Sequence, residues 1–111
     1  MRAATGDADL VEVCEEWSVE PGTGRRVTVG GRALAVFNVD GTFHVTDDTC
    51  THGFASLSEG SLRGQVIVCP WHGGAFDLCT GLPAAPPCVD PLTVHACEPR
   101  NGSIWARLKR I

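Results

Sequence analysis

The sequence has no hydrophobic run long enough to cross a bilayer, which takes about 20 consecutive apolar residues in a helix. Its longest apolar runs cover only residues 33–37 and 66–68. The first residues, 1–7, lack the apolar core of a secretory signal. The pair Arg25-Arg26 lies too deep in the chain to act as a twin-arginine address. These absences predict a soluble protein of the cytoplasm.

Positive charge is also scarce. The 111 residues include 9 Lys and Arg against 13 Asp and Glu, which gives a net charge of −4. Nucleic-acid binding rests on Lys and Arg that neutralise phosphates, so this composition argues against it. Mild acidity suits transient docking to a basic partner, but it serves solubility equally well. With 43% hydrophobic and 20% charged residues, the chain has the composition of one ordinary globular domain.

Sustained helical periodicity is absent as well, and 13 Gly and 7 Pro interrupt the chain at short intervals. We expect at most one helical turn, near residues 15–18 or 57–61. The pairs Asp40-Gly41 and Asn101-Gly102 are strong signals for two-residue hairpins. Short strands joined by frequent turns predict an antiparallel all-β sandwich or barrel. The expected strands cover residues 10–14, 25–29, 33–39, 42–46, 65–68, 92–97 and 103–108.

Two short motifs stand out in loops beyond the ends of expected strands. The first is Cys50-Thr51-His52, and the second runs from Cys69 through Pro70 and Trp71 to His72. Each motif supplies one thiolate and one imidazole, and these ligands bind zinc, copper and iron–sulfur clusters. We therefore predict Cys50, His52, Cys69 and His72 as metal ligands.

The mixed composition of the two motifs helps to choose the metal. Common structural zinc modules pair two cysteines in one motif and two histidines in the other. A two-iron cluster with two Cys on one iron and two His on the other suits mixed motifs, because each loop then supplies one ligand to each iron. No Ser–His–acid arrangement or glycine-rich nucleotide loop is present beside these motifs. A structural zinc module remains an alternative from a different class.

These residues resemble the signature of Rieske-type ferredoxins, the electron carriers of bacterial multicomponent aromatic-ring-hydroxylating dioxygenases. The resemblance extends to the hairpin at 37–41, the acidic pair Asp47-Asp48 before the first motif, the glycines after His72 and the proline segment at 82–91. It implies a basal antiparallel sandwich with an inserted cluster-binding subdomain. Here that subdomain would cover about residues 46–90 of a single domain, 1–111.

The resemblance also implies a function. One Rieske [2Fe–2S] cluster per chain would carry one electron at a time from an NAD(P)H-dependent flavin reductase to a terminal aromatic-ring dioxygenase. Both partners would bind transiently, and the carrier would be a monomer. The chain has no room for a mononuclear-iron oxygenase domain, so we expect a component and not an enzyme. A Rieske-like small subunit of another oxidoreductase, such as a nitrite reductase, remains open.

Departures from the high-potential members of this family point to a low potential. Those members link the two loops by a disulfide, where this chain has Ala55 and Trp71. They also place Ser and Tyr hydroxyls against sulfur atoms, where this chain has Gly74 and Phe76. Hydrogen bonds to sulfur stabilise the added electron, so their loss lowers the potential.

The remaining polar and aromatic residues are expected to be mostly structural. His44 and His95 are isolated histidines without a cysteine at ligand spacing. Trp71 either shields the cluster or belongs to a docking face, whereas Trp17 and Trp105 are core or rim aromatics. Four acidic residues form either a collar around the tip or an ordinary solvated surface: Asp47, Asp48, Glu59 and Asp90.

Four cysteines lie outside the two motifs. In a reducing compartment they are expected to be free, with Cys79 and Cys88 as the pair that could be an exception. The other two are Cys14 and Cys97.

Overall fold

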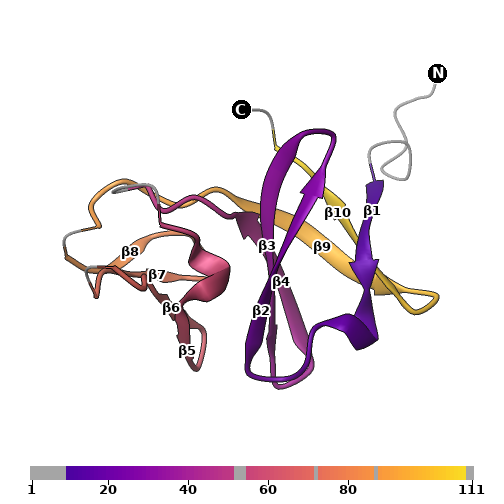
Figure 1. Cartoon of the computed structure of the whole chain (residues 1–111), viewed down its shortest axis with the longest axis horizontal. Helices are drawn as coiled ribbons and strands as arrows, with labels where there is room; N and C mark the ends of the chain where they lie inside the picture. The colour runs from indigo at the N-terminus through magenta and orange to yellow at the C-terminus, as the bar shows by residue number, and fades with distance from the viewer. Residues whose placement is uncertain (1–9, 52–54, 72, 87, 110–111) are drawn as a thin grey trace.

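The computed structural model describes residues 10–51, 55–71, 73–86 and 88–109. Within them the chain forms two antiparallel sheets, which confirms the all-β prediction (Figure 1). The larger sheet has the strand order β1-β10-β9-β4-β3-β2 and the smaller has the order β5-β6-β7-β8. No helix in the described part of the chain is long and apolar enough to span a membrane.

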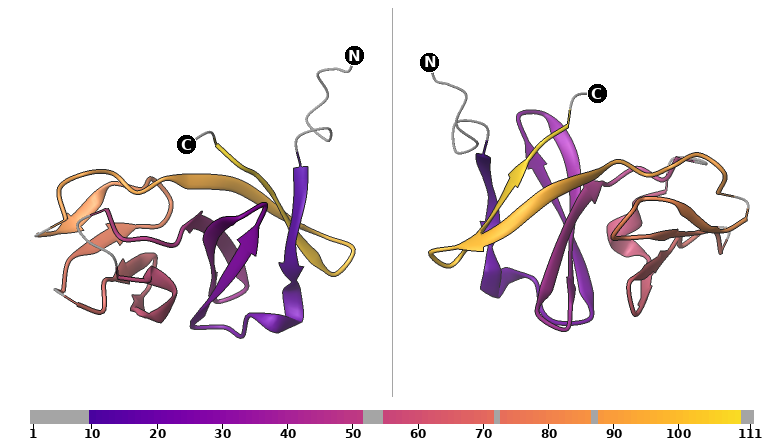
Figure 2. Two further views of the ribbon diagram at one scale, coloured as in Figure 1. Left: turned by 45° about the horizontal axis from the view of Figure 1, so that its top comes forward. Right: turned by 180° about the vertical axis from the view of Figure 1, so that it is seen from behind.

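The larger sheet comprises β1 (Leu10–Glu15), β2 (Thr23–Val29), β3 (Arg32–Val39), β4 (Thr42–Asp47), β9 (Val94–Arg100) and β10 (Ser103–Arg107). The smaller comprises β5 (Ser61–Arg63), β6 (Val66–Val68), β7 (Ala75–Asp77) and β8 (Pro83–Ala85). All four strands of the smaller sheet lie between β4 and β9 in the chain. Figure 2 shows this sheet set to one side of the larger one, at one end of the molecule.

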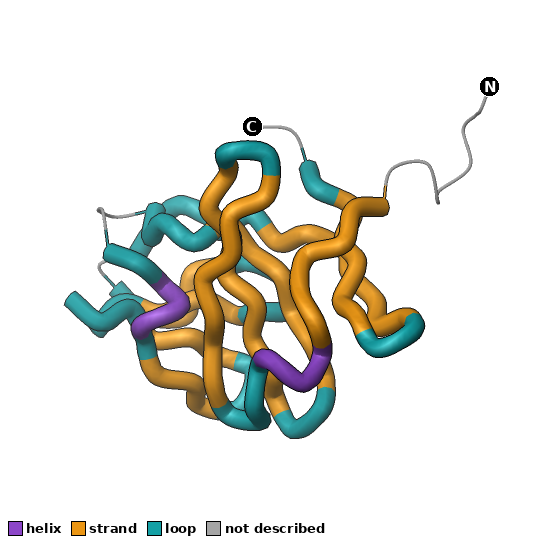
Figure 3. Tube along the Cα trace, turned by 45° about the vertical axis from the view of Figure 1, so that its right-hand side comes forward, coloured by secondary structure: helices purple, strands orange, loops and turns teal. Residues whose placement is uncertain are grey.

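The expectation of at most one helical turn was wrong, because both candidate segments form a short 3-10 turn (Figure 3). These turns are η2 (Glu16–Ser18) and η3 (Leu57–Glu59). Val19 N–H donates to the Glu16 carbonyl at 3.3 Å, and Gly60 N–H donates to the Leu57 carbonyl at 2.9 Å. A single 3-10 turn needs only one such hydrogen bond, and short 3-10 turns are common as connectors between strands. One turn therefore does not exclude the other.

Two-residue turns set the register of the larger sheet. Asp40 and Gly41 have φ angles of 51° and 91°, and the pairing of β3 with β4 ends at Val39 opposite Thr42. Asn101 and Gly102 have φ angles of 53° and 82° between β9 and β10. Positive φ at both central residues is what a type I′ hairpin requires, so both sequence predictions are confirmed.

Strand β3 separates two hydrophobic cores. The side chains from Leu34 to Phe37 are all fully buried, which explains why this segment is continuously apolar instead of alternating. Leu34 and Val36 belong to the core of the larger sheet. Ala35 and Phe37 belong to a second core beneath the smaller sheet, which we call the junction core. Its buried members are Ala35, Phe37, Cys50, Ala55, Leu57, Ile67, Cys69, Phe76, Leu78, Cys88 and Leu92.

Strand β9 turns its more polar face inward. His95 is 1% exposed, and Cys97 packs against the core of the larger sheet, whereas Ala96 is exposed. The histidine is buried because its ring is satisfied on both sides: Nε2 lies 2.9 Å from Asp47 Oδ1, and Nδ1 accepts from Lys109 N–H at 2.9 Å. Since Nδ1 is the acceptor, the proton of the neutral ring is on Nε2 and points at the carboxylate.

Candidate metal centre

The two predicted cysteine ligands lie at the junction of the two sheets. Cys50 follows the end of β4, and Cys69 comes directly after β6. Both side chains are 3% exposed, and both belong to the junction core. The two predicted histidine ligands, His52 and His72, lie outside the described residues.

The two loops begin with the same backbone bond. Cys50 N–H donates to the Ala55 carbonyl at 3.0 Å, and Cys69 N–H donates to the Gly74 carbonyl at 2.6 Å. In both cases the acceptor is five residues after the donor, so each bond closes a four-residue tip, at 51–54 and at 70–73. Each cysteine is therefore fixed at the base of a tip whose sequence contains one predicted histidine ligand.

A buried carboxylate organises the first loop. Asp48 is 3% exposed, and it accepts hydrogen bonds from the Ser56 hydroxyl at 2.5 Å and from Ser58 N–H at 3.0 Å. Its main-chain carbonyl accepts from Leu57 N–H at 2.7 Å. Arg26 of β2 lies 3.4 Å away and pairs with the carboxylate. Asp48 thus ties the two ends of the first loop together.

Neither member of the acidic pair before the first loop forms a solvated collar. Asp48 is buried, and Asp47 pairs with Arg32 at 3.0 Å and with His95 at 2.9 Å. Both residues are used to hold the loop on the larger sheet. The sequence shows their charge but not the partners that three other strands bring to them.

Close backbone packing joins the first loop to the second. A Cβ atom added to Gly60 would lie 2.1 Å from the Val68 carbonyl oxygen, immediately before Cys69. Since the φ angle of Gly60 is −79°, the residue is glycine for lack of space and not for backbone conformation. This contact fixes the start of the second loop against the end of the first.

The proline segment, 82–91, packs against the first loop. Thr51 donates its hydroxyl proton to the Asp90 carbonyl at 2.9 Å. Leu92 N–H donates to the Gly81 carbonyl at 2.7 Å and closes the base of the segment. Part of the segment is strand β8, which begins at Pro83 and lies at the edge of the smaller sheet, where a missing N–H is tolerated.

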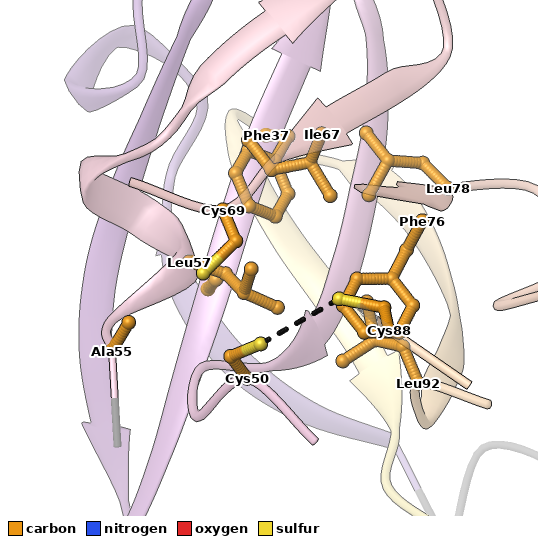
Figure 4. Close-up of a cluster of buried hydrophobic side chains, with 11 residues drawn as sticks. Phe37, Cys50, Ala55, Leu57, Ile67, Cys69, Phe76, Leu78, Cys88 and Leu92 are labelled. Atoms are coloured by element: carbon orange, nitrogen blue, oxygen red, sulfur yellow. Dashed lines mark hydrogen bonds between the residues drawn. The ribbon is translucent and has the colours of Figure 1, made fainter. Parts of the chain in front are cut away.

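Two sulfur atoms meet in the junction core. Figure 4 shows the sulfur atoms of Cys50 and Cys88 facing one another, with the side chain of Cys69 in the same core beside Leu57. Cys88 is 4% exposed, and its Sγ lies 3.9 Å from Cys50 Sγ. Burial, together with the neighbouring Cys50 and Cys69, raises the pKa of the Cys88 thiol to about 12. No disulfide forms among the six cysteines, and Cys79 is exposed while Cys88 is buried.

This arrangement fits a sulfur-ligated iron cluster. Two loops each place one buried cysteine in the same apolar core, from which water is largely excluded. The histidines outside the two motifs have other surroundings: His95 is bonded to Asp47 and Lys109, and burial lowers the pKa of His44 against the opposing effects of Gln65 and Asp77. Of the four predicted ligands, Cys50 and Cys69 lie within the described residues.

Three of the four positions that depart from the high-potential pattern are buried, and the fourth is exposed. Ala55, Gly74 and Phe76 are buried, and the Phe76 ring is fully enclosed in the junction core. Trp71, in the second loop, is 61% exposed. Leu82 and Val89 in the proline segment are exposed as well. Trp17 is 79% exposed and therefore lies on the surface.

Comparison with known proteins identifies the family. The Rieske [2Fe–2S] domain family matches residues 9–96, which include both motifs. The chain is 53% identical over 96 residues to ferredoxin CarAc of Metapseudomonas resinovorans, covering 86% of this chain and 90% of the relative. It is 46% identical over 99 residues to the ferredoxin component of the p-cumate 2,3-dioxygenase system of Pseudomonas putida, covering 87% of this chain and 84% of the relative.

A solved structure gives the same result for the fold. It is a complex of reduced oxygenase and oxidised ferredoxin in carbazole 1,9a-dioxygenase, in which the similar chain is 51% identical. The TM-score is 0.82, with 89% of this chain and 93% of that chain covered. These relatives are ferredoxins, so the cluster they imply is a [2Fe–2S] cluster and not a structural zinc ion, and the role is electron transport and not catalysis. The chain therefore belongs to the Rieske [2Fe–2S] family, among the ferredoxin components of aromatic dioxygenase systems.

Proposed function

We propose that this ferredoxin is a low-potential carrier that takes single electrons from an NAD(P)H-dependent flavin reductase and delivers them to a terminal aromatic-ring dioxygenase. The observation that carries the proposal is the pair of identically closed loops, each with a buried cysteine at its base. The protein would act as a soluble monomer in the cytoplasm and bind each partner transiently.

The ligand set of the proposal is Cys50, His52, Cys69 and His72. Two thiolates would bind one iron and two imidazoles the other, as in Rieske centres. The cluster-binding subdomain would be residues 46–90 of a single domain, 1–111. This division is supported by the smaller sheet and the junction core, because the strands β5 to β8 and both loops fall within it.

When bound, the cluster supplies reversible one-electron chemistry, and the chain determines how that chemistry is presented. The buried sulfurs of Cys50 and Cys69 lie on the protein side of the site, away from bulk water. The Asp48 network and the Gly60 contact hold the two loops in fixed positions. Two thiolates and two neutral imidazoles give a small negative charge on reduction, which makes reduction easier than with four thiolates.

The low potential rests on groups that the chain lacks. Gly74 and Phe76 offer no hydroxyl to sulfur, and Ala55 and Trp71 leave the two loops without a disulfide. A hydrogen bond that favours the reduced state by ~1 kcal/mol raises a one-electron potential by about 40 mV. Two missing bonds place the potential toward the lower end of the Rieske range.

The dioxygenase partner is supported by the similar ferredoxin that was solved in complex with its oxygenase. The exposed side chains of Trp71, Leu82 and Val89 come from the second loop and the proline segment, beside the two predicted ligand tips. Exposed apolar groups in such a place suit a transient interface, because aromatic residues contribute most to small contact areas. The acidic chain would complement a basic partner surface.

Reconstitution tests this function. Purified ferredoxin would be mixed with a flavin reductase, NADH or NADPH, a terminal aromatic-ring dioxygenase and its substrate, and product would be measured with and without ferredoxin. We expect ferredoxin-dependent product formation that saturates at substoichiometric ferredoxin, because one carrier serves many turnovers. A stable stoichiometric complex on gel filtration with another oxidoreductase, such as a nitrite reductase, and no turnover here would contradict the proposal.

A further inference from the structure

A third cysteine lies against the predicted ligand pair. Cys88 is in the proline segment, 38 residues after Cys50, and its Sγ lies 3.9 Å from Cys50 Sγ inside the junction core (Figure 4). The Cys88 side chain is 4% exposed, so no water competes for this contact. Neither of the two motifs that define the ligand set includes this residue.

The direction of the contact follows from the ligand assignment, so the inference rests on the proposed function. A cysteine that binds iron does so as a thiolate and has no proton to donate. A cysteine that binds no metal is a thiol, and its S–H group is a weak hydrogen-bond donor. The proton between the two sulfurs therefore belongs to Cys88, and Cys50 is the acceptor.

The fold holds this contact in place from both sides. The Thr51 hydroxyl bonds to the Asp90 carbonyl at 2.9 Å, which joins the residue after Cys50 to a residue near Cys88. The base of the proline segment is closed by the bond from Leu92 N–H to the Gly81 carbonyl. Because Gly81 has a φ of 80° and its Cβ position lies 2.2 Å from the Leu92 carbonyl, this closure leaves no room for a side chain. The two sulfur atoms are thus kept together by one side-chain and one main-chain hydrogen bond outside the cysteines themselves.

We propose that Cys88 is a positioning residue that donates an S–H···S hydrogen bond to the iron-bound sulfur of Cys50 and thereby raises the reduction potential of the cluster. A donor to a ligand sulfur stabilises the reduced state more than the oxidised state, because the added electron increases the negative charge on the sulfur. In this chain the thiol partly replaces the hydroxyl donors that are absent at Gly74 and Phe76.

A partly buried thiol elsewhere in the chain provides a control. Cys97 lies on β9 and packs against the core of the larger sheet, and its Sγ donates to the Phe43 carbonyl at 3.3 Å. Like Cys88, Cys97 forms a hydrogen bond, but it contacts the core of the larger sheet and not the junction core. Removing either thiol costs packing, but only the Cys88 thiol contacts a predicted ligand.

The test compares the potentials of the holoproteins Cys88→Ala, Cys88→Ser and Cys97→Ala with that of the wild type. We expect Cys88→Ala to lower the equilibrium constant for reduction about fivefold, which is about 40 mV at 59 mV per tenfold change. Cys88→Ser keeps a donor and should recover at least half of the shift, and Cys97→Ala should leave the potential unchanged. Infrared difference spectra should show an S–H band that shifts on reduction and is lost in Cys88→Ala.

The sign of the change in reduction potential distinguishes a hydrogen bond donated by Cys88 from a packing role of its side chain. If Cys88 only fills space, Cys88→Ala opens a cavity that admits water, which raises the potential by stabilising the reduced cluster, and Cys88→Ser gives no recovery. An unchanged or raised potential in Cys88→Ala, with iron and sulfide at wild-type content, would overturn the inference. Absence of iron and sulfide from the wild-type protein would instead overturn the proposed function, so the two failures are distinguishable.

Discussion

At the residue scale, the site depends on what sits next to the sulfur atoms. Phe76 is fully buried in the junction core, and Gly74 provides the carbonyl that closes the second loop. Neither side chain can donate a proton to sulfur. Both positions are nevertheless inside the protein, so a hydroxyl placed there would be shielded from water and available to the cluster.

We expect the double variant Gly74→Ser/Phe76→Tyr to raise the midpoint potential. Each new hydroxyl that bonds to sulfur contributes about 40 mV if it favours the reduced state by ~1 kcal/mol. Protein-film voltammetry measures the change, and Phe43→Tyr, on β4 and packed against the core of the larger sheet, serves as the control. The same potential in the wild type and the double variant, with the cluster intact, would show that these hydroxyls do not explain the low potential.

His95 makes stability depend on pH. Burial lowers its pKa, an effect only partly opposed by Asp47. Between that lowered pKa and the ordinary value of about 6.5, the unfolded chain binds a proton that the folded chain does not. Stability should therefore be full above about pH 6.5 and decline as the pH falls below it.

Urea unfolding of the holoprotein between pH 5.5 and 7.5 tests this. The variant His95→Gln should show a smaller dependence of the unfolding free energy on pH than the wild type. The dependence should not vanish, because burial lowers the pKa of His44 as well. Equal slopes in the two proteins would mean that His95 is not a source of the acid sensitivity.

At the scale of the elements, the two loops are held by contacts between segments that are distant in sequence. Hairpins and strands were predictable, because Asp40-Gly41, Asn101-Gly102 and the apolar run of β3 are local signals. Strands β5, β7 and β8 were not predicted, since each has only three residues and forms by pairing with a neighbouring strand of the smaller sheet. The burial of Asp48 and the approach of Cys88 to Cys50 also depend on tertiary packing and have no local sequence signal.

Gly60 provides a test of how the loops support each other. Gly60→Ala forces a Cβ to within 2.1 Å of the Val68 carbonyl oxygen, so the backbone before Cys69 must shift. We expect a loss of about 2–3 kcal/mol in unfolding free energy and faster loss of the cluster on heating. Thermal unfolding followed by circular dichroism and visible absorbance gives both quantities.

The matched control is Gly64→Ala. Gly64 has a φ of 59° with open space around its Cβ position, so alanine there costs ~1 kcal/mol of backbone strain without a clash. Gly60→Ala should be the more destabilising of the two and the only one that accelerates cluster loss. The opposite order would contradict the close contact between the loops.

At the scale of the whole molecule, the chain is elongated, with extents of 44 × 27 × 22 Å. The smaller sheet occupies one end, and η2 lies on the far side of the larger sheet (Figure 1). Exposed tryptophans occur in both regions: Trp71 in the second loop and Trp17 in η2. Electron exchange should therefore involve the first of these and not the second.

We expect Trp71→Ala to slow electron transfer to the oxygenase at least fivefold, because an exposed aromatic side chain at a small interface carries ~1 kcal/mol or more of contact energy. The midpoint potential should stay within about 10 mV of the wild type. Trp17→Ala should change neither quantity. Stopped-flow oxidation of the reduced ferredoxin measures the rate. Equal rates for Trp71→Ala and the wild type would place the docking face elsewhere.

The central claim is that two opposed loops hold a pair of irons, with sulfur from Cys50 and Cys69 on one and nitrogen from His52 and His72 on the other. Mössbauer spectroscopy of the purified protein before and after reduction, with iron and sulfide analysis, tests it most directly. We expect two irons and two acid-labile sulfides per chain, in two distinct sites of which only the nitrogen-ligated one is reduced. Two equivalent irons in all-sulfur sites, or zinc without iron and sulfide, would contradict it.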